Sequence, residues 1–215
     1  MIKPVGAIIH GPMMQPEVFW SFMGLANVGL QFIPVPYSPR QDMMRNVAAR
    51  RFLDTDATHL IYFDDRHIYP PDIVHKFAEA MVNYDIDVIG SRTYQLEPPF
   101  DKAYHPTEGA VVPHTDVMPV TKMYPAATMI SRKVIETLSW PLFYYEGGKV
   151  DVDMNDIFCF RASVNGHKSY VHMQVETPGL GIMQINSNTR EQYTKQHGIK
   201  TWYNEGKETS DPSEI

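Results

Sequence analysis

The chain has 215 residues, 43% of them hydrophobic and 20% charged, so it is long enough to bury a core and too apolar for a disordered protein. Its formal net charge of -6, without a basic block, argues against a protein that wraps nucleic acid. The single cysteine, Cys159, excludes an intrachain disulfide framework and favours a reducing, cytoplasmic setting.

The first half of the sequence alternates short apolar runs with amphipathic stretches. Residues 5–9 are too few for a membrane span and lack the features of a signal peptide, so we expect the first core strand there. Further strands are predicted over 30–35, 59–63 and 87–90, and helices over 15–28, 44–52 and 73–81. This succession predicts an α/β fold with a mostly parallel central sheet and helices on both faces.

The second half is less regular. Residues 96–123 contain several prolines and no sustained period, which predicts a long loop region with room for short strands. A strand is expected over 126–130, and helices over 134–138 and 153–164, the last with Ile157, Phe160 and Val164 on one face. The polar residues 203–215 predict a tail or linker after a single domain of residues 1–202, which fits a module of a larger chain.

Two adjacent acids, Asp64 and Asp65, follow the apolar strand predicted over 59–63. Ligands of open parallel sheets bind outside the carboxyl ends of the strands, so a site is expected here. Two carboxylates in this position can hold an oxygen-seeking divalent cation, which in turn neutralises a diphosphate. The alternative is that both acids only cap the following turn.

Several short motifs occur in an order that is more specific than any one of them. They are Arg45-Asn46, the strand ending in Asp64-Asp65, Pro70-Pro71-Asp72, Asp87 to Gly90, Pro98-Pro99, and Ala126 to Val134. Over roughly residues 5–181 this order resembles GT-A glycosyltransferases of the large inverting family two, particularly short members from phages and large DNA viruses. For a viral member the expected setting is the host cytoplasm.

The resemblance implies a nucleoside diphosphate sugar as donor and a divalent cation, Mn²⁺ or Mg²⁺, at the acidic motif. It implies that Asp64 contacts the ribose or the metal and that Asp65 ligates the metal. Arg45 would steady the nucleotide, and the turn at His10 would border the base. The alternatives are a solvated helix arginine and a histidine that satisfies a backbone group.

The sequence departs from the family pattern at the acidic motif. Arg66 occupies the usual third acidic position, where a fixed cation could stabilise the diphosphate. Read as D-x-H, the segment makes Asp65 and His67 the candidate metal ligands. Metal dependence is therefore an expectation that rests on two side chains.

The candidate general base is displaced as well. Relatives carry Glu-Asp at the start of the helix predicted over 153–164, and Met154 and Asn155 fall on those positions here. Asp153 and Asp156 remain as candidates; three residues apart on a helix, they are expected to face one cleft, with Asp156 preferred. Alternatively, both acids complement the helix dipole.

The expected activity is transfer of a sugar from a nucleoside diphosphate donor to a hydroxyl acceptor, for example on a glycan. The displaced base leaves open an inverting enzyme, a retaining enzyme or a catalytically degenerate carbohydrate-binding module. A sugar-phosphate nucleotidylyltransferase is the other enzymatic alternative, although its glycine-rich phosphate loop has no clear counterpart here.

Overall fold

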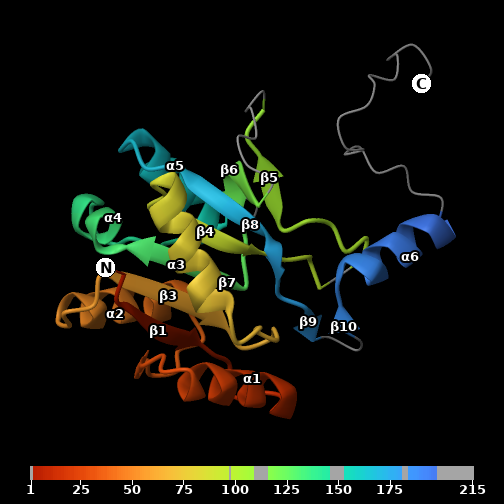
Figure 1. Ribbon diagram of the computed structural model, residues 1–215, viewed down its shortest axis with the longest axis horizontal. Coiled ribbons are helices and arrows are strands. Elements are labelled where there is room, and N and C mark those ends of the chain that lie inside the picture. The colour runs from red at the N-terminus through yellow and green to blue at the C-terminus, as the bar shows by residue number, and fades with distance from the viewer. Residues whose placement is uncertain (1, 97, 109–115, 146–152, 181–183, 198–215) are drawn as a thin grey trace.

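The structure is a computed structural model that describes residues 2–96, 98–108, 116–145, 153–180 and 184–197. Its centre is an eight-stranded sheet with strand order β2-β1-β3-β7-β4-β8-β6-β5 (Figure 1). The strands are β1 (Pro4–Ile9), β2 (Phe32–Ile33), β3 (His59–Asp64), β4 (Val88–Arg92), β5 (Tyr104–Pro106), β6 (Val117–Met123), β7 (Ala127–Ser131) and β8 (Ser169–Glu176). The short strands β9 (Gly179–Leu180) and β10 (Gln184–Ile185) pair separately.

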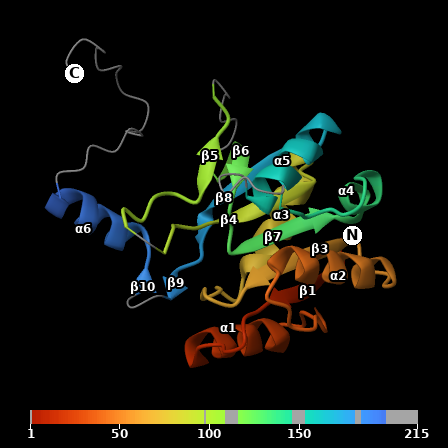
Figure 2. The same ribbon diagram turned by 180° about the vertical axis from the view of Figure 1, so that it is seen from behind.

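Helices cover both faces of the sheet (Figures 1 and 2). They are α1 (Pro16–Asn27), α2 (Gln41–Leu53), α3 (Ile73–Tyr84), α4 (Arg132–Thr137), α5 (Met154–Val164) and α6 (Ser187–His197). Successive side chains of a strand point to opposite faces, so β3 contributes to two cores. Leu60 and Tyr62 pack with residues of α2, α4 and α5, while Ile61 and Phe63 pack with residues of α1 and α3.

The strands run in mixed directions. β1 is parallel to both β2 and β3, and Ile9 lies opposite Asp64 at the ends of β1 and β3. β7 is antiparallel to β3 and β4, β8 is parallel to β4, and β6 is antiparallel to β5 and β8. The predicted α/β class with flanking helices is confirmed, and the sheet is mixed because β6 and β7 run against their neighbours.

The second half contains more strand than the sequence predicts. β5 and β6 fall in the region expected to be a long loop with short strands. β8, a central strand, was not predicted, because the polar residues Ser169 and His172 occupy buried positions on it and hide its apolar pattern. Residues 203–215, the predicted tail, lie outside the described residues.

The buried face of α5 differs from the predicted one. Phe160 and Val164 are 68% and 70% exposed, and the residues that face the sheet include Met154 and Phe158. These two follow the four-residue spacing of one helix face, whereas Phe160 and Val164 occupy another. The prediction of a shared buried face for Ile157, Phe160 and Val164 was therefore wrong for the last two.

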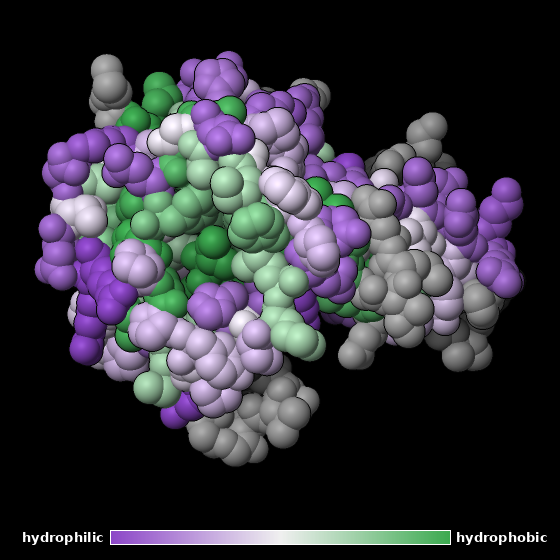
Figure 3. All heavy atoms as spheres, turned by 90° about the horizontal axis from the view of Figure 1, so that it is seen from below, coloured by the Kyte–Doolittle hydropathy of each residue, from purple (hydrophilic) through white to green (hydrophobic). Residues whose placement is uncertain are grey.

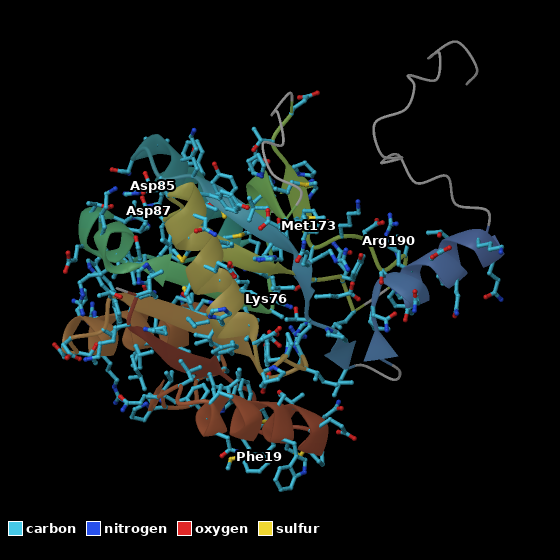
Figure 4. All side chains as sticks on the ribbon, in the orientation of Figure 1. Phe19, Lys76, Asp85, Asp87, Met173 and Arg190 are labelled. Atoms are coloured by element: carbon cyan, nitrogen blue, oxygen red, sulfur yellow. The ribbon has the colours of Figure 1, made fainter. Side chains whose placement is uncertain are left out.

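One outer surface, on α1, is apolar. Phe19 and Trp20 are 49% and 68% exposed, and Phe19 points away from the sheet (Figure 4). Figure 3 views the molecule from this side and shows apolar residues among the polar ones. Within the described residues, no helix is both long and apolar enough to cross a membrane.

Candidate functional site

Asp64 and Asp65 stand at the carboxyl end of β3, next to the end of β1. The Asp65 carboxylate accepts a hydrogen bond from the backbone N–H of Gly11, in the turn after β1. The backbone N–H of Asp64 donates to the carbonyl of Ala126, just before β7, at 2.8 Å. The two acids are thereby fixed where three strand ends meet, which is the edge expected for a ligand site.

The Asp64 carboxylate is held by its two successors in the chain. Its Oδ1 accepts from the backbone N–H of Arg66 at 2.8 Å and from Nε of Arg66 at 3.2 Å, and Nδ1 of His67 lies 3.3 Å away. Burial alone would raise the pKa of Asp64, but His67 and Arg66 outweigh it and hold this pKa well below its usual value. Asp64 is therefore an anion at neutral pH.

The environment of Asp65 is different. Its pKa is raised, first by burial and further by the neighbouring charge of Asp64, against the opposing effect of the Gly11 hydrogen bond. A bound cation would relieve this repulsion between the two carboxylates. The negative charge of Asp64 is thus already balanced by neighbouring residues, whereas Asp65 can still bind a cation.

Asp64→Asn tests the charge pairing at this site. The pKa of Asp64 is lower in the folded chain than the ordinary value of 3.8, so its ionised form contributes stability above that value and the contribution is lost as the pH falls below it. We expect a loss of about 1–3 kcal/mol at pH 7 that shrinks toward pH 3. Urea unfolding at both pH values measures it; an equal loss at both would contradict the ionic role.

Arg45 of α2 is buried, which excludes the solvated helix arginine considered above. It is 5% exposed, and its guanidinium carbon lies 5.3 Å from the ring centre of Tyr62 and 5.5 Å from that of Phe143. Within the described residues its Nε has no hydrogen-bond partner and the side chain has no ion pair. A buried guanidinium is costly unless an anion completes it, so the position suits a ligand phosphate or carboxylate.

A cavity of about 380 Å³ brings Arg45 and Asp64 together. It lies between the carboxyl ends of β3 and β4, the segment before β7 and the start of α5. Its lining includes Gln41, Arg45, Asp64, Arg66, His67, Thr93, Tyr94, Tyr124, Asp153 and Asn155. Asp65 is not part of this lining, because its carboxylate turns toward Gly11 on the β1 side.

Asn46 fixes the wall that holds Arg45. Its Oδ1 accepts from the backbone N–H groups of Leu142 and Phe143 at 2.9 and 3.2 Å, and its Nδ2 donates to the Phe143 carbonyl at 2.6 Å. These bonds hold the Phe143 ring against the Arg45 guanidinium. The Arg-Asn pair of the sequence motif therefore has one residue at the cavity and one behind it.

Three buried hydroxyl groups form a network that sequence reasoning missed. Ser91, Thr93 and Thr177 lie within 2.9–3.1 Å of one another, and Thr93 also accepts from the backbone N–H of Ala126 at 3.2 Å. The network joins the ends of β4 and β8 to the segment before β7, and Thr93 lines the cavity. Single hydroxyl residues far apart in the sequence carry no pattern that predicts such a contact.

The two candidate bases do not face one cleft, contrary to the prediction. Asp153 is the N-cap of α5, where its carboxylate accepts from the backbone N–H of Asn155 at 2.7 Å, and it lines the cavity with Asp64. Asp156 instead accepts from Nζ of Lys122 at 3.0 Å and lines a separate cavity. The reason is that an N-cap residue has extended backbone angles, so helical spacing does not apply to it.

The two candidate histidines face groups of the protein, His10 with both ring nitrogens and His67 with one. The ring nitrogens of His10 lie 2.9 Å from the Gly11 carbonyl and 3.2 Å from the Val35 carbonyl, as expected for a histidine that satisfies backbone groups. His67 Nδ1 faces Asp64, and its Nε2 is buried against Gly179, where a Cβ atom would lie 3.1 Å from it. Gly179 therefore closes the side of His67 that a metal would need.

The carboxylates of Asp64 and Asp65 suit a hard cation whose remaining coordination positions are filled by a bound ligand. No group of three or more His, Cys, Asp or Glu side chains suited to a metal occurs in the described part of the chain. Mg²⁺ at nucleotide sites commonly uses one or two carboxylates, with phosphate oxygens and water for the rest. Asp64 and Asp65 fit this requirement. His67 fits it less well, because its Nδ1 faces Asp64 and Gly179 packs against its Nε2, which has no hydrogen-bond partner among the described residues.

The arrangement of the sheet is similar to that of several solved structures. A197 from STIV aligns with a TM-score of 0.64 and 15% identity, over 84% of this chain and 86% of its own. A Bacillus anthracis protein assigned as a glucose-1-phosphate thymidylyltransferase aligns at 0.51 and 7%, over 94% and 98%. The chain has the GT-A fold. S. aureus TarS 1-349 aligns at 0.51 and 11% over 82% of this chain, which spans only 59% of that one.

No family model and no curated protein sequence matches the chain. Structural likeness at identities of 15% or less shows the GT-A fold and leaves the reaction to the residues of the site. In this GT-A chain those residues gather at the carboxyl ends of β3 and β4, where ligands of open α/β sheets bind.

Proposed function

We propose that the protein transfers a sugar from a nucleoside diphosphate sugar to a hydroxyl acceptor, for example on a glycan. The observation that carries the proposal is the cavity of about 380 Å³, whose lining includes the anionic Asp64 and the buried Arg45, a side chain without an ion pair among the described residues. A donor of this class offers both partners at once, because its phosphates suit a guanidinium and its ribose and sugar hydroxyls suit a carboxylate.

In this proposal each residue of the site has a role that its position supports. Arg45 binds a phosphate oxygen from the α2 side, and Asp64 accepts a hydroxyl of the ribose or sugar. Asp65 and Asp64 would hold a divalent cation, Mn²⁺ or Mg²⁺, which when bound supplies charge neutralisation of the diphosphate. The turn of His10 and Gly11, tied to Asp65, borders the base of the nucleotide.

Asp153 is the better of the two candidate bases. A base must come within about 3 Å of the acceptor hydroxyl, and of the two acids only Asp153 lines the cavity with Asp64. In an inverting reaction its carboxylate removes the acceptor proton on the side opposite the departing diphosphate. In this scheme the role of Asp156 is structural, through its ion pair with Lys122.

The second candidate function is a sugar-phosphate nucleotidylyltransferase, favoured by the likeness to the thymidylyltransferase-assigned structure. Incubation with a panel of nucleotide sugars, manganese and neutral sugar acceptors separates the two. Release of nucleoside diphosphate supports sugar transfer. Release of a sugar 1-phosphate and nucleoside triphosphate on addition of pyrophosphate supports the second candidate, and binding without turnover supports a degenerate carbohydrate-binding module.

Arg66 is predicted to provide metal-independent activity. Its guanidinium forms an ion pair with Asp64, and its side chain is 57% exposed and lines the cavity. It can therefore stabilise the negative charge of the departing diphosphate. We expect turnover to persist in chelator at about 1% of the manganese rate or more. Arg66→Ala should remove this remaining activity. Complete loss of turnover in chelator alone would contradict the prediction.

Arg40→Ala is the matched control for Arg66→Ala. Arg40 is also an exposed arginine paired with an aspartate two positions away, Asp42, but it does not line the cavity. It should leave the chelator-resistant rate unchanged.

A further inference from the structure

The loop between β4 and β5 supplies a large part of the wall of the Asp64 cavity. We call residues 93–103, of which residue 97 lies outside the described part of the chain, the β4–β5 loop. Its lining residues are Thr93, Tyr94, Gln95, Leu96 and Ala103. None of these side chains is charged, whereas Arg45 and Asp64, which bind the donor in the proposed function, are charged. The uncharged wall therefore remains for the acceptor.

Backbone contacts tie the two arms of the β4–β5 loop together. The N–H of Gln95 donates to the carbonyl of Asp101 at 2.8 Å. Tyr94 and Lys102 form an antiparallel bridge beside this bond. An element that holds the second arm therefore also fixes the first arm, which lines the cavity.

Helix α6 contacts the second arm of this loop. Nη2 of Arg190, labelled in Figure 4, lies 3.3 Å from Oδ1 of Asp101. The ring of Tyr193 meets that of Phe100 edge-on, with 5.3 Å between the ring centres. Asp101 is 53% exposed, so the ion pair alone is weak and the aromatic pair supplies more of the contact. In the described part of the chain α6 does not itself line the cavity.

The chain that leads into α6 is anchored at the acidic turn. The N–H of Leu180 in β9 donates to the carbonyl of Arg66 at 2.7 Å. Ile185 of β10 is 2% exposed and packs in one cluster with Tyr94 and Phe100. Figures 1 and 2 show the β4–β5 loop extending from the sheet toward α6. The segment from β9 to α6 thus contacts both the acidic turn and the loop.

We propose that Arg190 and Tyr193 are positioning residues for the acceptor. They hold the β4–β5 loop in the place where Tyr94, Gln95 and Leu96 contact the acceptor, an inference that rests on the proposed sugar transfer. Donor binding does not depend on α6, because the charged groups that bind the donor lie on α2 and at the end of β3.

Hydrogen exchange measured by NMR tests the contact between α6 and the loop without any substrate. We expect the Gln95 amide to exchange about 5-fold faster or more in Tyr193→Ala, and about 2-fold faster in Arg190→Ala. The Asp64 amide, which donates to Ala126 in the sheet, should exchange as in the parent protein, which distinguishes loosening of the loop from global unfolding. Unchanged exchange of Gln95 in both variants would overturn the proposal.

Steady-state transfer tests the role in acceptor binding, with glucose, galactose and N-acetylglucosamine as acceptors and the donor that gives turnover in the panel above. Tyr193→Ala should raise the KM for the acceptor about 5-fold or more, while kcat and the KM for the donor stay within about twofold. Arg190→Lys keeps the charge beside Asp101 and should behave like the parent protein. Lys195→Ala is the matched control for Arg190→Ala, since it removes the same charge from an exposed position of α6.

The two measurements separate this inference from the proposed function. Absence of transfer in the parent protein would contradict the proposed function and with it the acceptor role, while the exchange rates would still decide whether α6 holds the loop. An unchanged KM for the acceptor despite faster exchange of Gln95, or an equal rise of both KM values in Tyr193→Ala, would overturn the positioning of the acceptor by α6.

Discussion

Asp65→Asn is expected to weaken manganese-dependent binding of the donor by about 100-fold, which corresponds to about 2.7 kcal/mol. The substitution keeps an oxygen that can accept the hydrogen bond of the Gly11 N–H, so the turn after β1 stays linked to the end of β3. It removes the negative charge, which a divalent cation requires from its carboxylate ligands. Calorimetric titration of the donor with manganese, and again with chelator, measures the effect.

The loss should be confined to the manganese titration. Binding in chelator should fall much less, because Arg45 and Asp64 remain in place. Asp56→Asn serves as the control, since this exposed aspartate pairs with Lys3 away from the cavity and should leave both titrations unchanged. Equal donor affinity of Asp65→Asn and the parent in manganese would remove Asp65 from the site.

Asp153→Asn is expected to reduce the rate of transfer by about 100-fold or more while donor affinity stays within about twofold. An asparagine oxygen still caps α5 by accepting from the Asn155 N–H, so the helix should keep its start. What the variant loses is the ability to take a proton from the acceptor. Single-turnover transfer rates together with donor titrations separate these two properties.

Asp156→Asn is the comparison that decides between the two acids. Asp156 lies three residues after Asp153 but lines the other cavity, so its replacement should leave single-turnover transfer largely intact. The reverse result, with transfer lost in Asp156→Asn alone, would restore the choice made from sequence. Normal transfer in both variants would favour a retaining mechanism that needs no such base.

The regular first half of the fold could be predicted because its strands are buried on both faces and its helices carry a clear period. β3 has four successive apolar or aromatic residues after His59, and its end at Asp64 is marked by the change to charge. β8 escaped prediction because Ser169 and His172 sit at buried positions. No local pattern indicates that β7 would pair between β3 and β4, since that choice is made by residues far apart in the chain.

The part of the candidate site that lies at the end of β3 could be predicted from the sequence. Asp64 and Asp65 lie at the expected edge, and Arg45 reaches the same cavity as Asp64. The surroundings of His67 could not be predicted, because they include Gly179 of β9, which is far away in the sequence. The separation of Asp153 from Asp156 depends on a boundary of one residue at the start of α5, and boundaries are the weakest part of a periodicity argument.

The place of β7 also bears on how the protein is made. β7 follows β3 and β4 in the chain but completes the facing edges of both, and the backbone of Asp64 itself bonds to Ala126. A nascent chain that has emerged only as far as β4 therefore leaves one edge of β3 and both edges of β4 unpaired, and such edges invite intermolecular pairing. The acidic turn acquires its final position only when β7 arrives, so a fragment ending after β4 should aggregate instead of binding a nucleotide.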